Sequence, residues 1–96
     1  MRTQHLHLQS LRRRACREQG GRCFYCLRPM GRNVTAEHLV ARMDGGKDTA
    51  SNIVAACRRC NEARHALVPG AAPDPETHQG FMLLMVAAGL YPDERP

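Results

Sequence analysis

The sequence predicts a small α+β domain in which a two-stranded hairpin is flanked by helices. Three observations support this class. The chain has 96 residues, the size of one domain with a modest core. Two apolar segments surround a turn-rich stretch near its middle, and helix-forming segments lie on both sides. Five cysteines accompany only two Phe, two Tyr and no Trp, which suggests that metal binding supplements the core. We therefore treat residues 1–96 as a single domain.

The first helix is expected at about residues 8–19. The segment LQSLRRRACREQ places Leu8 and Leu11 on one face, its arginines point mostly outward, and two glycines follow it. A second helix is expected from Cys57, because CRRCNEARHAL contains good helix formers and no breaker before Pro69. Between these helices lies the predicted core of the domain, at about residues 22–66.

The hairpin is expected in the middle of this core. The segments NVTAEHLVA (33–41) and NIVAAC (52–57) contain the β-branched and apolar residues of strands. The turn-rich stretch RMDGGKDTAS joins them, so antiparallel pairing is the expected arrangement.

A linker and an apolar helix complete the chain. VPGAAPDP (68–75) reads as a linker from its Pro and Gly content. A helix is then expected at about residues 75–89, with Asp74 as its N-cap and Pro75 at its first position. It is apolar nearly all round but too short to cross a bilayer. Packing on the domain is the first interpretation, and a contact with a second copy or a larger complex is the alternative.

Charge is distributed unevenly along the chain. The formal net charge is +5, but residues 1–65 carry +8 and residues 66–96 carry −3. Such a basic segment favours a polyanionic partner, most simply nucleic acid, although a merely solvated surface gives the same charge pattern. The arginines expected to contact phosphate are Arg12, Arg13, Arg14, Arg58, Arg59 and Arg64.

The sequence also predicts the cellular setting. No segment resembles a secretory signal or has transmembrane length, so no membrane association is expected. An odd cysteine count with two CxxC pairs argues against a disulfide framework. A cytoplasmic location is the resulting expectation.

The paired cysteines predict a structural zinc site. Cys23 with Cys26 and Cys57 with Cys60 supply four thiolates, the ligand set of a closed tetrahedral site, while a redox dithiol is the alternative. The fifth cysteine, Cys16, is expected to be a buried apolar thiol, with a reactive thiol or a fifth ligand as the alternative. No partner is expected for His5, His7 or His78, which we place at the surface.

An acid, an imidazole and two amides accompany the second half of the zinc site. The stretch AEHLVARMDGGKDTASNIVAACRRCNEARH is similar to the core of the HNH endonucleases, in the branch with two zinc-binding CxxC pairs. The resemblance covers roughly residues 22–65. It implies a small zinc-stabilised ββα-metal fold, treble-clef-like, with the first and third helices as flanking additions.

The resemblance also implies roles for individual residues. Glu37 corresponds to the acidic ligand of the catalytic metal and His38 to the general base, while Asn52 corresponds to the Asn that ties down the loop and orients the base. Asn61 corresponds to the second metal ligand. His65 lies one helical turn later, and a third ligand and an exposed helix histidine are both open for it. Two features deserve a structural test. The family usually has Asp at the position of Glu37, and strand alternation sends Glu37 and His38 to opposite faces.

The chemistry follows from the same residues. Phosphodiester hydrolysis needs a base for water and a cation for the phosphate, and an imidazole with a pKa of about 6.5 can serve as that base. Carboxylate and amide oxygens favour Mg²⁺ or Mn²⁺, whereas a histidine ligand favours a softer ion such as Ni²⁺. The expected function is therefore metal-dependent endonucleolytic hydrolysis of DNA, as nicking or double-strand cleavage. The alternatives are a non-catalytic zinc module that binds nucleic acid and a subunit of a larger phage or restriction complex.

Overall fold

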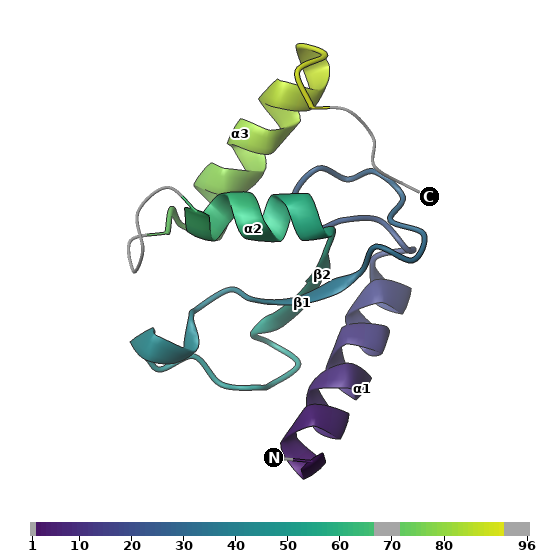
Figure 1. Ribbon diagram of the computed structural model, residues 1–96, viewed down its shortest axis with the longest axis vertical. Coiled ribbons are helices and arrows are strands. Elements are labelled where there is room, and N and C mark those ends of the chain that lie inside the picture. The colour runs from purple at the N-terminus through teal and green to yellow at the C-terminus, as the bar shows by residue number, and fades with distance from the viewer. Residues whose placement is uncertain (1, 67–71, 92–96) are drawn as a thin grey trace.

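The computed structural model describes residues 2–66 and 72–91, with side chains from His7 onward. The α+β class is confirmed, with helices around a two-stranded antiparallel sheet (Figure 1). The elements in chain order are α1 (Arg2–Glu18), β1 (Thr35–His38), the 3-10 helix η1 (Arg42–Asp44), β2 (Ile53–Ala56), α2 (Arg58–Ala66) and α3 (Pro75–Ala87). The first part of the predicted linker, residues 68–71, lies outside the described residues, as does residue 67 before it.

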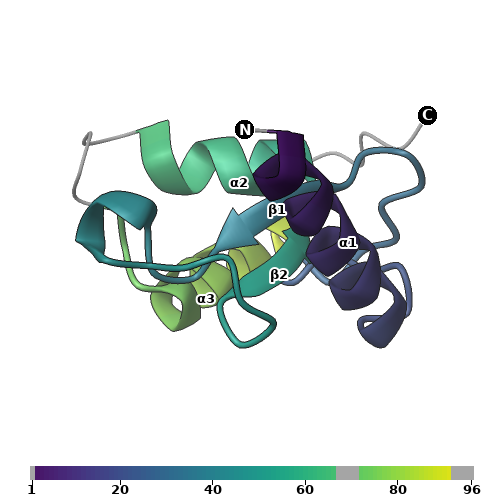
Figure 2. The same cartoon turned by 90° about the horizontal axis from the view of Figure 1, so that it is seen from below.

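Helix α1 packs along both strands, and α2 packs against β1. Figures 1 and 2 place α1 and η1 on opposite sides of the hairpin. The helix begins at Arg2 rather than at residue 8, since no Pro or Gly interrupts the preceding residues. It ends as predicted at Gly20 and Gly21, which both have positive φ, and the Gly21 amide donates to the Cys16 carbonyl at 2.8 Å.

The two strands pair antiparallel, with Glu37 opposite Val54 and His38 opposite Ile53. Both are shorter than predicted. Beyond His38 the Leu39 amide still bonds the Asn52 carbonyl, but the next amide, of Val40, donates to the Asn52 side chain at 2.8 Å. A side-chain amide thus replaces the backbone ladder, and the strand ends at that point.

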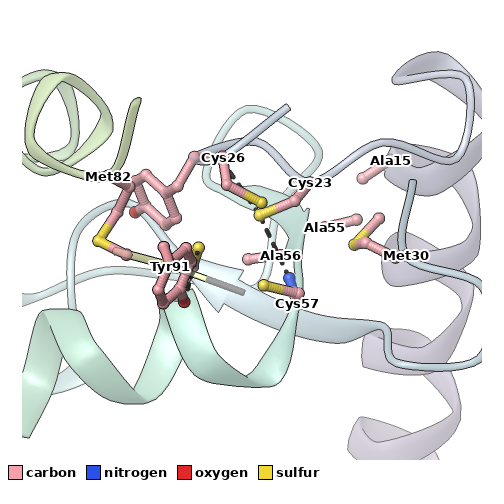
Figure 3. Close-up of a cluster of buried hydrophobic side chains, with 11 residues drawn as sticks. Ala15, Cys23, Cys26, Met30, Ala55, Ala56, Cys57, Met82 and Tyr91 are labelled. Carbon is pink, nitrogen blue, oxygen red and sulfur yellow. Dashed lines mark hydrogen bonds between the residues drawn. The ribbon is translucent and has the colours of Figure 1, made fainter. Parts of the chain in front are cut away.

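The core is built from small and sulfur-containing side chains. Figure 3 shows the thiols of Cys23 and Cys26 between Met82 and Tyr91 on one side and Ala15 and Met30 on the other. The alanines and cysteines bury little apolar area compared with Trp, Phe or Leu. The core therefore depends on what the sulfur atoms do in addition to packing.

Helix α3 begins as predicted, with the Asp74 side chain accepting a hydrogen bond from the Thr77 amide at 2.8 Å. It ends at Ala87, two residues earlier than expected. One face is buried on the domain through Met82, whereas Phe81 and Leu84 are 52% and 66% exposed. The apolar sequence is thus only partly explained by packing within the chain, and a contact with another molecule stays a prediction.

His78 corrects one expectation. It was placed at the surface without a partner, but it is buried, lies 2.9 Å from the Cys60 carbonyl through Nε2, and packs edge-on against Tyr25. Burial lowers the pKa of His78, and its hydrogen bond to the backbone opposes that shift. His7 is exposed as expected, but its Nε2 lies 3.0 Å from the carbonyl oxygen of Asp48.

Gln19 provides a test of how α1 is joined to the sheet. Its amide nitrogen donates to the carbonyls of Arg22 and Ala55 at 2.7 and 2.8 Å, and its oxygen accepts from the Ala55 amide at 2.9 Å. We predict that Gln19→Ala lowers the free energy of unfolding by about 2 to 3 kcal/mol, because partly buried backbone groups lose their partner. Urea unfolding measures this. The control Gln9→Ala, on the same helix, should change stability by less than about 0.5 kcal/mol; equal losses would refute the bridging role.

Candidate active site and metal centre

The four paired cysteines meet in the core. The Sγ atoms of Cys23, Cys26, Cys57 and Cys60 all lie within 4.8 Å of one another, and all four residues are buried. Cys23 Sγ accepts hydrogen bonds from the backbone amides of Tyr25 and Cys57 at 3.4 and 3.3 Å, the second of which is drawn in Figure 3. Cys60 Sγ accepts one from the Tyr91 hydroxyl at 3.2 Å. Such donors stabilise sulfur that carries negative charge.

Local structure brings each pair to this point. The first pair lies in a knuckle where Leu27 has a φ of 62° and donates its amide to the Cys23 carbonyl at 3.0 Å. The second pair spans a strand-to-helix junction, since Cys57 directly follows β2 and Cys60 lies in the first turn of α2. A bound ion would therefore join the knuckle, the hairpin and α2.

The donor set fits a metal ion. Four sulfurs around one zinc at about 2.3 Å lie roughly 3.8 Å apart, within the observed limit of 4.8 Å. Hydrogen bonds from Cys23, Cys57 and Cys60 hold the pKa of Cys26 well below its usual value. Contacts with Cys23, Cys26 and Cys57 raise the pKa of Cys60 instead. Four crowded thiols cannot all ionise unaided, and a cation removes this conflict.

Glu37 is the buried acid of β1. Its carboxylate is 2% exposed, and Oε2 accepts hydrogen bonds from the Tyr25 hydroxyl at 2.9 Å and from Arg64 Nη1 at 3.1 Å. The other oxygen, Oε1, lies 3.1 Å from His65 Nε2. An ionised buried carboxylate needs such compensation, and Arg64 provides it. One oxygen is thus anchored in the core, while the other is directed toward α2.

Asn61 and His65 come from the same face of α2, one turn apart. The Asn61 amide nitrogen donates to Thr35 Oγ1 at 2.9 Å, which leaves Oδ1 without a hydrogen-bond partner among residues 7–66 and 72–91. Two ligands at right angles on a divalent ion, each at about 2.1 Å, lie about 3 Å apart. The 3.1 Å between Glu37 Oε1 and His65 Nε2 matches that separation, so both atoms could bind one cation.

His38 lies at the last position of β1, and its Nε2 is 2.7 Å from Asp48 Oδ1. It faces a different side of the strand from Glu37, as alternation requires. Both nevertheless line one open hollow of about 440 Å³, together with Asn61 and His65. This is feasible because the hollow lies at the strand end, where the side chains of neighbouring residues reach the same space.

The loop between the strands is fixed by Asn52. Its Oδ1 accepts from the Val40 amide at 2.8 Å, and its Nδ2 donates to the carbonyls of Val40 and Lys47, both at 3.0 Å. Gly46 allows the same close packing, since a Cβ at this position would overlap the Val40 carbonyl. Asn52 thus holds the loop that follows His38.

Arg64 corrects a prediction. It was expected to contact phosphate, but its side chain is only 6% exposed. Its guanidinium donates to Glu37 and to the carbonyls of His38, Leu39 and Pro73. A buried guanidinium with these partners cannot contact a phosphate. Arg64 instead balances the charge of Glu37 and holds the end of β1 against α2.

The other predicted arginines lie nearer the surface. Arg12 and Arg58 line a second hollow of about 400 Å³, which shares Leu8 and Ala36 with the first. Arg13 is exposed, Arg14 pairs with Glu18 at 2.8 Å, and Arg59 lies over the Tyr91 ring. Of the predicted arginines, Arg12 and Arg58 thus line the hollow that adjoins the candidate site, whereas the hollow of the site itself is lined by Arg42.

Sequence reasoning missed Tyr25, Arg42 and Asp48. Tyr25 is a knuckle residue whose hydroxyl reaches Glu37, and burial raises its pKa. Asp48 bonds both His38 and Arg42, and these contacts, with His38 first, hold the pKa of Asp48 below its usual value. The only signal for the last two was charge in a turn-rich loop, which surface loops commonly carry.

Comparison with known proteins agrees with this geometry. A family model described as HNH endonuclease matches residues 23–67. The resemblance to the HNH family is confirmed over this segment. No curated protein matches the chain. The HNH segment contains all four clustered cysteines and every residue of the candidate active site, whereas α1 and α3 lie outside it. No helix in the described part of the chain is long and apolar enough to cross a membrane.

Loss of one sulfur ligand tests the metal centre. We predict that Cys57→Ala abolishes cooperative thermal unfolding and bound metal, because metal binding here is folding free energy. Circular dichroism melting and elemental analysis measure both quantities. Cys16→Ala is the matched control, since Cys16 is half-buried and outside the cluster, and it should keep the metal and a cooperative transition. A Cys57→Ala protein with an unchanged thermal midpoint would contradict the assignment.

The Glu37–Arg64 pair gives a second test in the HNH segment. We predict that Arg64→Ala lowers the free energy of unfolding by about 3 to 5 kcal/mol, because it leaves a buried carboxylate without its counter-charge. In a Glu37→Gln background the same substitution should cost much less. The exposed control Arg13→Ala should change stability by under about 0.5 kcal/mol. Equal costs in the two backgrounds would show that the pair is not coupled.

Proposed function

We propose that the chain is a metal-dependent endonuclease that hydrolyses phosphodiester bonds in DNA. The observation that carries this proposal is the meeting of Glu37, His38, Asn61 and His65 at one open hollow beside a cationic surface. A module that only binds nucleic acid has no need for a carboxylate, an amide oxygen and two imidazoles around one space. The match to the HNH family supports the same reaction class.

Two ions with different roles belong to this proposal. Zn²⁺ is the structural ion of the cysteine cluster, because four thiolates in a closed, buried site are its preferred ligands. Glu37, Asn61 and His65 would hold a second divalent cation, which supplies charge stabilisation at the phosphate and the leaving oxygen when bound. Mg²⁺ or Mn²⁺ suits the two oxygens, and the imidazole nitrogen favours Ni²⁺ or a similar ion.

Each side chain has a defined task in the reaction. His38 takes the proton of the attacking water. Attack on phosphorus breaks the bond to the 3′ oxygen, which takes a proton from solvent, and leaves a 5′ phosphate and a 3′ hydroxyl. Hydrogen bonds from Tyr25 and Arg64 hold the Glu37 carboxylate in a fixed position. The Glu37 carboxylate can then keep one position during the whole reaction.

DNA binding is assigned mainly to the phosphate backbone. Arg12 and Arg58 border the hollow next to the candidate site, and Arg13 extends the cationic surface along α1. Contacts of this kind fix position but carry little sequence information. Weak sequence specificity is the consequence for so small a domain.

Helix α3 exposes apolar side chains that could contact a second molecule. Phe81 and Leu84 are more than half exposed on one helix, which favours a contact with another copy or with a larger complex. The five cysteines form no disulfide with one another, which fits a reducing compartment, and we therefore place the protein in the cytoplasm. Light scattering at several concentrations would detect self-association. A monomer at every concentration would exclude a contact with another copy and leave a contact with a larger complex.

Cleavage of supercoiled plasmid tests the function. We predict conversion to nicked or linear DNA that requires added Mg²⁺, Mn²⁺ or Ni²⁺, and a loss of roughly 10²- to 10⁴-fold in rate for His38→Ala, the cost of removing a general base. The variant must keep its structural metal and its DNA affinity, measured by elemental analysis and fluorescence anisotropy.

Each alternative has its own result in this experiment. Equal cleavage by wild type and His38→Ala would indicate a contaminant or a different base. No cleavage by wild type with any of the metals, while DNA is still bound, would instead support a non-catalytic binding module.

A further inference from the structure

Asp48 forms a small charged cluster with His38 and Arg42 at the rim of the candidate site. Asp48 Oδ1 lies 2.7 Å from His38 Nε2, and Oδ2 accepts from Arg42 Nη2 at 3.0 Å. The side chains of His38 and Asp48 are only 16% and 20% exposed, whereas Arg42 is 61% exposed. The carboxylate is therefore largely shielded from water and bonded through both oxygens.

This arrangement determines where the proton of the imidazole lies. An ionised carboxylate only accepts hydrogen bonds, so a 2.7 Å contact requires that His38 Nε2 carries the hydrogen. Arg42 Nε also lies near Nε2, at 3.3 Å, but a nitrogen that carries hydrogen cannot accept a strong bond from it. The stronger contact of Arg42 is therefore its ion pair with Asp48.

The other ring nitrogen is left available. Within residues 7–66 and 72–91, Nδ1 of His38 has no hydrogen-bond partner, whereas Nε2 is occupied by Asp48. A neutral imidazole with hydrogen on Nε2 has its basic lone pair on Nδ1. When Nδ1 takes a proton from water, the ring becomes a cation, and the carboxylate at 2.7 Å stabilises that charge.

The backbone keeps Asp48 in place from both sides. The Thr49 amide bonds the Lys47 carbonyl at 3.0 Å, and Asn52 Nδ2 also donates to that carbonyl. From α1, His7 Nε2 lies 3.0 Å from the carbonyl oxygen of Asp48 itself. A carboxylate on such a restrained segment can fix a ring orientation, because its own position varies little.

We propose that Asp48 is a positioning residue for His38, fixing the tautomer with hydrogen on Nε2 so that Nδ1 is the atom that accepts the proton of the attacking water. Arg42 orients Asp48 through its second oxygen. The catalytic consequence rests on the proposed nuclease function, but the tautomer does not, and it can be measured separately.

The first experiment reads the tautomer directly. Protein labelled with ¹⁵N at histidine is studied by long-range ¹H–¹⁵N correlation at a pH of about 8, above the ordinary imidazole pKa of about 6.5. Loss of one set of signals in His38→Ala assigns the ring. We expect wild type to show hydrogen on Nε2 alone, and Asp48→Ala to show a mixture of tautomers. Hydrogen on Nδ1 in wild type, or identical spectra with and without Asp48, would overturn the proposal.

The second experiment measures the consequence for cleavage. We expect Asp48→Ala to lower kcat roughly 10- to 100-fold, the usual cost of losing an orienting partner, with KM for DNA nearly unchanged. Asp48→Asn keeps the shape and one acceptor oxygen, and it should recover part of the rate. The control Asp44→Asn removes an exposed acid of the same loop and should leave kcat unchanged.

The two experiments separate the two ideas. A wild type without nuclease activity but with hydrogen on Nε2 would refute the proposed function and retain the role of Asp48 in holding the ring. An active enzyme whose kcat is the same in Asp48→Ala would refute the positioning role and retain the function. Thermal midpoint and metal content of each variant confirm that the fold is intact.

Discussion

The four sulfur atoms gathered within 4.8 Å are the contact on which the rest of the structure depends. They join the knuckle, the end of β2 and the start of α2, while Tyr91, beyond α3, donates its hydroxyl to Cys60. The remaining core consists largely of alanine, methionine and tyrosine side chains, and a chain of this size has only a modest core. An ion bound by these sulfurs would set the geometry of the strand and helix that present the candidate site.

The buried charge of Glu37 is the second constraint, and it follows from the first. The knuckle brings the Tyr25 hydroxyl to one carboxylate oxygen, and α2 brings Arg64 to the same oxygen. Because these contacts satisfy Oε2, Oε1 can approach His65 near the hollow. One oxygen of Glu37 is thus held in the core, and the other lies toward the hollow. The longer side chain of Glu compared with Asp allows this reach from the strand into the core.

The candidate site lies at the end of β1, which explains how side chains from both sides of the strand reach one hollow. Alternation sends Glu37 and His38 to different sides of β1, yet the hollow extends around the end of that strand and contacts both. The loop after His38 returns Asp48 to the ring, and Asn52 fixes this path by replacing backbone hydrogen bonds. Arg12 and Arg58 border the adjoining space, so a phosphate chain could pass from the cationic surface into the site.

The sequence by itself determined the types and order of the elements, the pairing of the cysteines and the resemblance to the HNH family over residues 23–67, because strand alternation, helix caps and CxxC spacing are local patterns. Only the tertiary structure decided which charged side chains are buried. Arg64 was indistinguishable from Arg58 in sequence, yet one lies against Glu37 and the other is exposed. His78 and Asp48 likewise acquire their roles from partners 18 and 10 residues away. Burial and pairing depend on how distant segments pack, and no local pattern encodes that.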